Sequence, residues 1–179
     1  PNSIELIGGE NIVVKNCQLG AQPTGITCKV QEVNKLSFIN NQVYPDGREN
    51  LVLDACNNCV IEGNNFKSYY NGILVLNGND NTVNKNIFWL TGAVQNQLLD
   101  HGDDFGIINV KGNNNMVASN SLSCEWAYAG AVTVNAVQGT GNVFKNCFVD
   151  NLESYRVFLV NAQTEVSNCV SSDKVSIVE

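Results

Sequence analysis

An asparagine recurs in a single register along most of the sequence. Each copy stands in the pattern apolar-x-x-Asn-x-apolar, with departures at Gln18 and Glu165, and successive copies are separated by 25, 23, 22, 34, 26 and 22 residues. The recurring positions are Asn16, Asn41, Asn64, Asn86, Asn120, Asn146 and Asn168. Because Asn tolerates left-handed backbone and hydrogen-bonds nearby backbone groups, this spacing indicates a turn that is repeated in every unit of an ordered array.

Short segments with alternating apolar residues lie upstream of most of these turns, and each ends in a small residue. The segments are 4–8 (IELIG), 51–55 (LVLDA), 74–78 (LVLNG), 108–112 (INVKG), 132–136 (VTVNA) and 158–162 (FLVNA). Short strands that recur about every 22 residues, with small residues and Asn at the corners, are the signature of a parallel β-helix.

We therefore predict an all-β fold: a right-handed, single-stranded parallel β-helix of about seven coils, with residues 1–179 forming one domain. Stacking the coils about 4.8 Å apart places their apolar side chains in one continuous core and the recurring asparagines in one column. In that column each amide bonds its neighbour and the turn backbone, so these buried polar groups are satisfied. No segment of useful length has helical periodicity, which argues against α/β folds.

The two ends of the predicted solenoid are the next feature. A solenoid normally covers its exposed strand edges with a helix or an atypical repeat. Here the first coil begins within a few residues of Pro1, without an amphipathic segment before it, and the last residues, VSIVE, form a bare strand. We expect the chain to be the later part of a longer solenoid, or to be covered by another chain in a homo-oligomer.

The charge balance restricts the classes of partner. The sequence has 10 Lys and Arg against 17 Asp and Glu, a net charge of -7 and a pI near 4.6. An acidic surface without a basic cluster argues against nucleic acid or an anionic membrane as partner. No apolar run approaches the roughly 20 residues that span a bilayer, and the amino end does not have the pattern of a signal peptide.

The seven cysteines are an odd number, so at least one thiol stays free. Cys56 and Cys59 form a C-x-x-C, which is the pattern of half a zinc site or of a redox pair. The single His and the lack of a second C-x-x-C argue against zinc, and no βαβ pattern surrounds the motif. We expect both residues to be ordinary small residues in a turn between strands. We predict no metal site and no cofactor.

The interval between Asn86 and Asn120 exceeds the usual coil, and the excess lies in an inserted loop at 89–106 (WLTGAVQNQLLDHGDDFG). Insertions in solenoids map to loops on one face, often the binding face. The candidate residues of this loop are Trp89, Asp100, His101, Asp103 and Asp104. Carboxylates beside an aromatic plate suit a sugar site. A solvated polar loop tip is the alternative, and a calcium site is a weaker one because the spacing of a dedicated calcium loop is missing.

The outward side of the aligned strands is a second candidate surface for extended carbohydrate. Strand alternation points one polar row away from the core: Asp54, Asn77, Lys111, Asn135 and Asn161. The alternative is that this row is the ordinary polar face of a sheet. Glu125, Trp126 and Tyr128 form a third cluster, which either completes a cleft with the insertion or makes an oligomer contact.

Four segments resemble the carboxy-terminal half of the inulin fructotransferases, the family that releases difructose anhydrides from inulin. They are SIELIGGENIVVKNCQL, LVLDACNNCVIEGNNF, DDFGIINVKGNNNMVASNSLS and VFLVNAQTEV. The likeness covers most of the chain, and the DDFG element after the insertion is its most specific part. The resemblance implies a right-handed parallel β-helix assembled as a trimer, with active sites between subunits.

The resemblance also implies a chemistry, which is intramolecular fructosyl transfer without metal or organic cofactor. An acidic residue helps to expel the rest of the polymer, and a hydroxyl of the terminal difructose unit attacks in place of water. The family's catalytic Asp and Glu lie on the coil before the stretch that matches SIELIG, so they would precede residue 1. Asp103 and Asp104 match the family's acidic pair after the insertion, and the resemblance implies that they contact substrate or another subunit.

Two further readings stay open. In the first, the chain is a non-catalytic β-helix module, which binds carbohydrate or supports assembly. In the second, it is a polysaccharide lyase, a class that usually has basic residues beside calcium-binding acids; Lys111 beside Asp54 matches this pattern only weakly. For the catalytic reading, Asp100, His101, Asp103 and Asp104 are the candidate catalytic residues, and Trp89, Asp54, Lys111, Glu125 and Trp126 join the acidic pair as candidate substrate contacts. A polymeric fructan substrate implies action outside the cell, as a secreted protein of bacterial type. The odd number of cysteines argues against this location, because disulfides form in an oxidising exterior and one thiol would stay unpaired.

Overall fold

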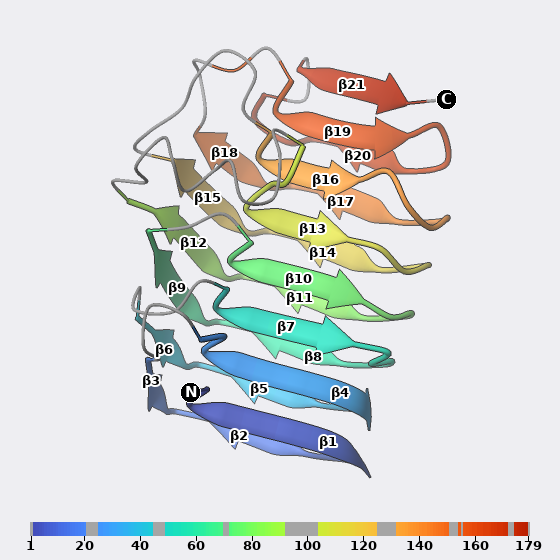
Figure 1. The fold of residues 1–179 in the computed structure, drawn as a ribbon. Coiled ribbons are helices and arrows are strands. Elements are labelled where there is room, and N and C mark those ends of the chain that lie inside the picture. The colour runs from blue at the N-terminus through green and yellow to red at the C-terminus, as the bar shows by residue number, and fades with distance from the viewer. Residues whose placement is uncertain are drawn as a thin grey trace.

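The chain winds into a parallel β-solenoid, in which successive coils stack along one axis from the N-terminal to the C-terminal coil (Figure 1). This arrangement is seen in a computed structural model that describes residues 2–20, 25–44, 49–69, 72–91, 104–124, 132–150, 154, 156–171 and 174–178. All the strand pairs within the three sheets are parallel. The predicted all-β parallel β-helix is therefore confirmed.

Each complete coil contributes one strand to each of three sheets. The first sheet contains β1 (Ile4–Glu10), β4 (Cys28–Asn34), β7 (Leu51–Asp54), β10 (Leu74–Asn77), β13 (Ile108–Val110), β16 (Val134–Ala136), β19 (Phe158–Asn161) and β21 (Val175–Val178). The second contains β2 (Val13–Lys15), β5 (Ser37–Ile39), β8 (Val60–Glu62), β11 (Thr82–Asn84), β14 (Met116–Ala118), β17 (Val143–Lys145) and β20 (Glu165–Ser167). The third contains β3 (Gln18–Leu19), β6 (Gln42–Val43), β9 (Asn65–Ser68), β12 (Ile87–Leu90), β15 (Ser121–Cys124) and β18 (Phe148–Asp150).

Among the described residues, six coils carry a strand in all three sheets, and β19, β20 and β21 extend the first two sheets beyond them. The prediction of about seven coils is therefore slightly too high. All six segments predicted as strands contain a strand of the first sheet, because alternation of apolar and polar residues matches the period of two of a half-buried strand. The strand β4 had no counterpart among those six segments.

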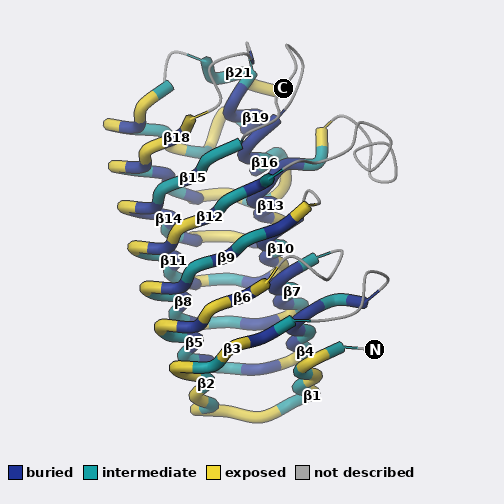
Figure 2. Tube along the Cα trace, turned by 90° about the vertical axis from the view of Figure 1, so that its left-hand side faces the viewer, coloured by how far each residue is buried: buried dark blue, intermediate teal, exposed yellow. Residues whose placement is uncertain are grey.

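The core runs along the inside of the solenoid, where the inward residues of the middle coils are buried, whereas β1 and β2 at the N-terminal end and β20 and β21 at the C-terminal end are only partly covered (Figure 2). Stacking in register brings like residues together. The rings of Phe66 and Phe88 are stacked with centroids 4.9 Å apart, and Phe38 lies 6.1 Å from Phe66 on the other side. Such a stack of fully buried aromatic rings fixes the register between coils, since a slip of one residue would turn every ring outward.

An internal asparagine ladder occupies the corner between the second and third sheets. The side-chain amide of Asn41 donates to Oδ1 of Asn64 over 3.0 Å, Asn64 donates to Asn86 over 2.9 Å, and Asn86 donates to Asn120 over 3.0 Å. Each Oδ1 also accepts the backbone N–H of the preceding coil, as Asn64 does from Asn41. The predicted ladder is confirmed at these four positions, all of which are buried.

The prediction that Asn16, Asn146 and Asn168 belong to the same column is wrong. The column position next to Asn41 is held by Cys17, whose backbone N–H donates to Oδ1 of Asn41. Cys147 and Cys169 hold the corresponding positions after Asn120, and the backbone N–H of Cys147 points to Sγ of Cys169. Asn16, Asn146 and Asn168 each stand one residue earlier, at the exposed corner position.

That corner position has a left-handed backbone in every coil. The φ angle is 57° at Asn16, 54° at Asn146 and 52° at Asn168, and Asn40, Gly63, Lys85 and Ser119 occupy the same corner. Asn suits two adjacent positions here for different reasons, namely left-handed backbone at the first and amide pairing at the second. Because Asn occurs at both positions, the predicted ladder position was placed one residue too early in the coils of Asn16, Asn146 and Asn168.

A second internal ladder lies at the corner between the first and second sheets. The amide of Asn81 donates to Asn115, and that of Asn115 donates to Asn142. Oδ1 of Asn81 accepts the backbone N–H of Cys59, which starts this column. Cys56 and Cys59 are both buried in the turn between β7 and β8 as free thiols, which confirms that they are small residues in a turn.

In the described part of the chain, no helix has the length and the apolar character needed to cross a membrane.

Candidate functional site

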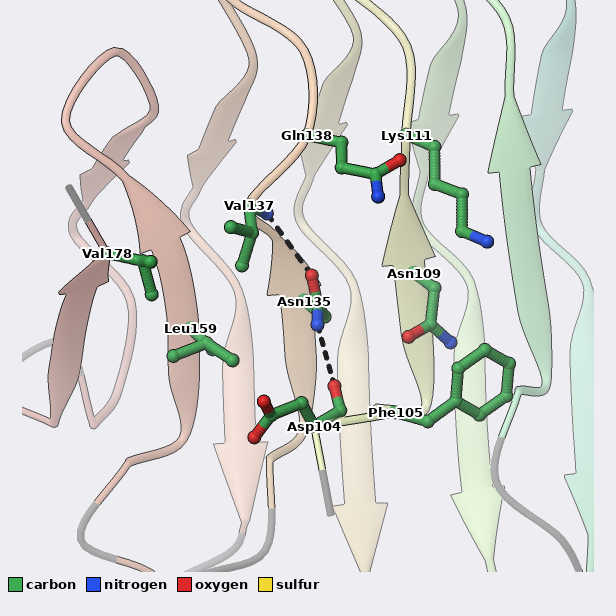
Figure 3. Close-up of a pocket in the computed structure, with 9 residues that line it drawn as sticks. All are labelled: Asp104, Phe105, Asn109, Lys111, Asn135, Val137, Gln138, Leu159 and Val178. Carbon is green, nitrogen blue, oxygen red and sulfur yellow. Dashed lines mark hydrogen bonds between the residues drawn. The ribbon is translucent and has the colours of Figure 1, made fainter. Parts of the chain in front are cut away.

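A cavity of about 270 Å³ lies on the outer face of the first sheet, over β13, β16, β19 and β21 (Figure 3). Its lining residues are Asp104, Phe105, Asn109, Lys111, Asn135, Val137, Gln138, Leu159 and Val178. Two of the predicted candidates, Asp104 and Lys111, thus meet at one site. The lining combines amides, one carboxylate and one ammonium group with an aromatic ring and aliphatic side chains.

The segment that carries Asp104 is hydrogen-bonded to two strands of the first sheet, β13 of its own coil and β16 of the next coil. Oδ1 of Asn109 accepts the backbone N–H of Gly106 at 2.9 Å, and Nδ2 of Asn109 donates to the Gly106 carbonyl at 2.8 Å. Nδ2 of Asn135, one coil further, donates to the carbonyl of Asp104 at 2.7 Å. These bonds convert the end of the insertion into a fixed wall of the cavity.

Glycine at two positions allows this wall to form. Gly72 has a φ of 78°, and a Cβ placed on it would lie 2.4 Å from the ring of Phe105. Its N–H donates to the carbonyl of Gly106 at 2.9 Å, so the two segments are in direct contact. A Cβ on Gly106 would lie 2.6 Å from the carbonyl oxygen of Thr133. The glycine of the DDFG element is therefore required by close backbone approach.

The charges at the cavity are arranged asymmetrically. Nη1 of Arg156 donates to the carboxylate of Asp104 at 2.6 Å, and the Asp104 side chain is 63% exposed. Lys111 is exposed and makes no ion pair with any residue that the structure describes. In Figure 3 the carboxylate of Asp104 and the ring of Phe105 point in opposite directions at one end of the cavity. The cavity thus offers one oriented acceptor and one uncommitted cationic donor.

The predicted outward polar row needs one correction, which concerns Asn135. This residue pairs with Asn109 and Leu159, so it lies in the row of Val52 and Val75 rather than in that of Asp54. The reason is that the corner residue over Gly112 is Gly139, not Ala136. The corner of this coil therefore comes later in the sequence than the small residue at 136 indicates.

Asp54 stays apart from the cavity. Its carboxylate accepts the amide of Asn77 at 2.7 Å and that of Gln31 at 3.4 Å, and Asp54 pairs with Asn77 in the sheet. Lys111 follows β13, the strand after Asn77, and is thus about 9.6 Å from Asp54 along the solenoid axis. The two residues are not adjacent, so this pair does not form the cation–acid contact that the lyase reading requires.

Trp89 lies on the third sheet, in β12, and not beside Asp104. Nζ of Lys67 lies 4.1 Å from the centroid of its ring, in the geometry of a cation–π contact. A smaller cavity of about 110 Å³ adjoins the ring, lined by Gln42, Val43, Tyr44, Asn65, Lys67 and Trp89. Trp89 and Asp104 thus lie on different faces of the solenoid. That both residues contact one substrate stays a prediction.

The remaining candidates, Asp100, His101, Asp103, Glu125 and Trp126, lie outside the described residues. Of the predicted insertion 89–106, Trp89 and Leu90 end β12, and residues 104–106 lead toward β13. Residues 92–103 are likewise outside the described part.

One ion-pair partner and six cavity residues were missed by the sequence reasoning, the latter being Phe105, Asn109, Val137, Gln138, Leu159 and Val178. Asn109 and Leu159 share the outward row with Asn135, and a correct register would have found them. Phe105 and Gln138 come from turns, where alternation gives no signal. Arg156 is 52 residues from Asp104, and nothing in the local pattern relates them.

The described residues do not assemble the ligands of a common metal site. Among them, no three His, Cys, Asp or Glu side chains come together in a group that could hold an ion. A structural zinc site takes about four ligands and a calcium site about six to eight. The described residues supply neither set.

Comparison with known proteins gives one family and one fold. The family model described as "Periplasmic copper-binding protein (NosD)" matches residues 1–167. A search of curated proteins finds no match to this sequence.

The solved structures with a similar fold include several of the DFA-IIIase from Arthrobacter chlorophenolicus A6. The structure without its lid has a TM-score of 0.81 at 22% identity and covers 96% of this chain and 45% of that one. The complex with GF2 has a TM-score of 0.79 at 21% identity, covering 96% and 46%. This chain therefore spans about half the length of that enzyme. The resemblance to the inulin fructotransferases is confirmed as a likeness of fold.

Proposed function

The chain belongs to the family described as periplasmic copper-binding protein (NosD), and we propose that this member binds fructans at the cavity beside Asp104. The observation that carries the proposal is the composition of the cavity wall. Sugar-binding sites combine apolar surface for the faces of the ring with a few oriented polar groups for its hydroxyls. Phe105, Val137 and Leu159 supply the first, and Lys111 and Gln138 supply the second.

The fold supports the substrate class. A solved structure of a protein with the same fold, the DFA-IIIase, holds GF2, and another holds DFA-III. The outer face of a parallel sheet repeats its side chains about every 4.8 Å, which offers successive contacts to an extended saccharide. We extend this to the present chain as a proposal, with GF2 and DFA-III as its first test ligands.

The proposed reaction is intramolecular fructosyl transfer that releases a difructose anhydride from inulin. Glycosidic bond chemistry commonly uses two carboxylates. The described wall of the cavity supplies one, Asp104, and Arg156 is bonded to it. In this proposal Asp104 and Lys111 position the saccharide, while the acid that protonates the leaving group comes from elsewhere in the whole protein. Action outside the cell and assembly as a homotrimer belong to the same proposal.

Binding is tested by titrating GF2 into the purified chain in a calorimeter. Replacing Lys111 with Ala removes the uncommitted donor, and we expect the dissociation constant to rise about tenfold, equivalent to roughly 1.4 kcal/mol. Lys15→Ala is the matched control, because Lys15 is exposed on the second sheet, away from the cavity. Equal affinities for the wild type and Lys111→Ala would refute the proposed site.

Transfer is tested separately by incubating the chain with inulin and separating the soluble products. Release of a difructose anhydride supports the transfer reaction. Saccharide binding without any product supports the second candidate function, a non-catalytic carbohydrate-binding module, which the single carboxylate of the described cavity favours.

The family description implies copper, and the residues present decide which oxidation state fits. Cu(II) prefers nitrogen and oxygen ligands in a tetragonal arrangement. The one His of the sequence, His101, lies outside the described residues, and no group of three ligands occurs among those described. Between the two copper ions, thiolate ligands favour Cu(I), and the sequence has seven cysteines. The donor set therefore fits the cuprous ion better than the cupric ion, and no step of the saccharide chemistry passes through copper.

A further inference from the structure

Three large side chains occupy the outward side of the third sheet on successive coils, where β6, β9 and β12 lie side by side (Figure 2). Lys67 of β9 pairs with Trp89 of β12, and Tyr44, which follows β6, stands at the same level one coil earlier. Trp89 points away from the core because its neighbours Phe88 and Leu90 are buried. Coils stack about 4.8 Å apart, so Lys67 stands between two aromatic residues along the solenoid axis.

The cavity of about 110 Å³ beside this row, called the third-sheet cavity below, has a cationic lining. Among its described lining residues Lys67 alone is charged, and it makes no ion pair with another described residue. Gln42 and Asn65, which pair with each other in the adjacent row, add two amide groups. The lining of the first-sheet cavity differs, because it includes the carboxylate of Asp104. Of the two cavities, the third-sheet cavity therefore favours an anionic ligand.

Lys67 is positioned by contacts at both ends of the residue. Its Nζ lies 4.1 Å from the centroid of the Trp89 ring, and its carbonyl oxygen accepts Nδ2 of Asn50 at 2.9 Å. Asn50 is fully buried, and the same Nδ2 lies 3.5 Å from the carbonyl oxygen of Tyr44. An ammonium group has three N–H donors and no acceptor, so contact with one ring leaves donors for a bound anion. The cation is thus held at the cavity before any ligand arrives, which lowers the cost of binding.

We propose that the third-sheet cavity binds a sugar that carries a carboxylate, namely a uronic acid unit of an acidic saccharide. The aromatic surface of Tyr44, which is 43% exposed, suits the apolar face of a sugar ring. The amides of Gln42 and Asn65 bond the sugar hydroxyls, and Lys67 pairs with the carboxylate in a charge-assisted hydrogen bond.

The size and the charge of the cavity set its selectivity. Its volume of about 110 Å³ is below the roughly 300–1,000 Å³ of pockets for drug-sized ligands, so it suits a single sugar unit. A neutral fructan has no carboxylate for Lys67 and gains nothing from the cation. The inference does not rest on the proposed fructan function, since the two cavities lie on different sheets and differ in charge.

The test follows the indole N–H of Trp89 in NMR spectra of the isotope-labelled full chain during titration with digalacturonate. The sequence has two Trp, so a spectrum of Trp126→Phe identifies the Trp89 signal. We expect a saturable shift of this signal with digalacturonate and none with its dimethyl ester, which has the same sugar rings without the charges. No shift with the acid, or equal affinity for the ester, would overturn the proposal.

Variants of single lysines locate the binding. In Lys67→Gln we expect the dissociation constant for digalacturonate to rise roughly fivefold, the effect of losing one partly exposed ion pair. Lys15→Gln is the matched control, because Lys15 is exposed on the second sheet, and its affinity should be unchanged. Weaker binding in Lys111→Gln but not in Lys67→Gln would place the acid in the first-sheet cavity and contradict the site. Titration of Lys67→Gln with GF2 reports on the fructan proposal alone, so the two proposals fail separately.

Discussion

The guanidinium of Arg156 donates to the carboxylate of Asp104 over 2.6 Å and so connects two turns that are 52 residues apart in sequence. The Asp104 side chain is 63% exposed and that of Arg156 20% exposed. An ion pair this open to solvent adds roughly 0–1 kcal/mol to stability. Its main effect is to hold the Asp104 carboxylate at the edge of the cavity in one orientation.

Removing the Asp104 carboxylate should weaken saccharide binding while leaving the stability of the fold nearly unchanged. For Asp104→Ala we expect the dissociation constant for GF2 to rise about tenfold, while the free energy of unfolding falls by less than about 1 kcal/mol. Calorimetric titration and urea unfolding measure the two quantities. An unchanged affinity in a folded variant would show that Asp104 does not contact the saccharide.

Gly72 is expected to be the most sensitive glycine beside the cavity. In Gly72→Ala the new methyl group meets the ring of Phe105 and also stands at a φ of 78°, so we expect a loss of roughly 2–4 kcal/mol of unfolding free energy. Gly8→Ala is the control, with a φ of 70° and open space around the Cβ, and should cost roughly 1–2 kcal/mol. Equal losses in urea unfolding would mean that the contact with Phe105 adds nothing.

The asparagine ladder should be far less tolerant than the exposed corner. Asn64→Ala removes the acceptor of two donors of Asn41 and the donor to the carbonyl of Phe38, and we expect a loss of roughly 3 kcal/mol or more. Asn146→Gly, at a left-handed exposed corner, should change stability by less than about 0.5 kcal/mol. The midpoints of urea unfolding compare the two variants, and a similar midpoint for both would contradict the assignment of Asn64 to the ladder and Asn146 to the corner.

Stability should fall with pH above 9 because of Cys28. Burial, with a smaller contribution from Cys17, raises the pKa of the Cys28 thiol to about 12 from 9.0. Between these two values the unfolded chain releases this proton and the folded chain keeps it, so the folded state loses stability as pH rises. Comparing pH 8 with pH 10, we expect the wild type to lose about 1 kcal/mol more than Cys28→Ala. Urea unfolding at both pH values measures the difference, and equal losses would exclude this cause.

The solenoid itself was predictable because the sequence shows both of its periods, the two-residue period of each strand and the roughly 22-residue period of the coil. Alternation of apolar side chains within a strand locates the first sheet, and the recurring Asn locates the corners. What the pattern could not resolve was which of two adjacent corner positions a given Asn holds. Asn40 and Asn41 illustrate the difficulty, since the first has left-handed backbone and the second forms the ladder.

The candidate site was predictable only in part. Asp104 was identified because it lies in the inserted loop, and Lys111 because it lies in the outward polar row. Their meeting depends on how the coils align, and the turn at Gly139 shifted Asn135 out of the predicted row. The pairing of Arg156 with Asp104 depends on turns from different coils, for which local alternation carries no information.

The most direct test of the proposed function is a crystal structure of the chain with GF2. The account predicts saccharide density in the cavity on the first sheet, with hydroxyls within hydrogen-bonding distance of Lys111 and Gln138. Saccharide bound only on the third sheet beside Trp89, or no bound saccharide at saturating GF2, would contradict it.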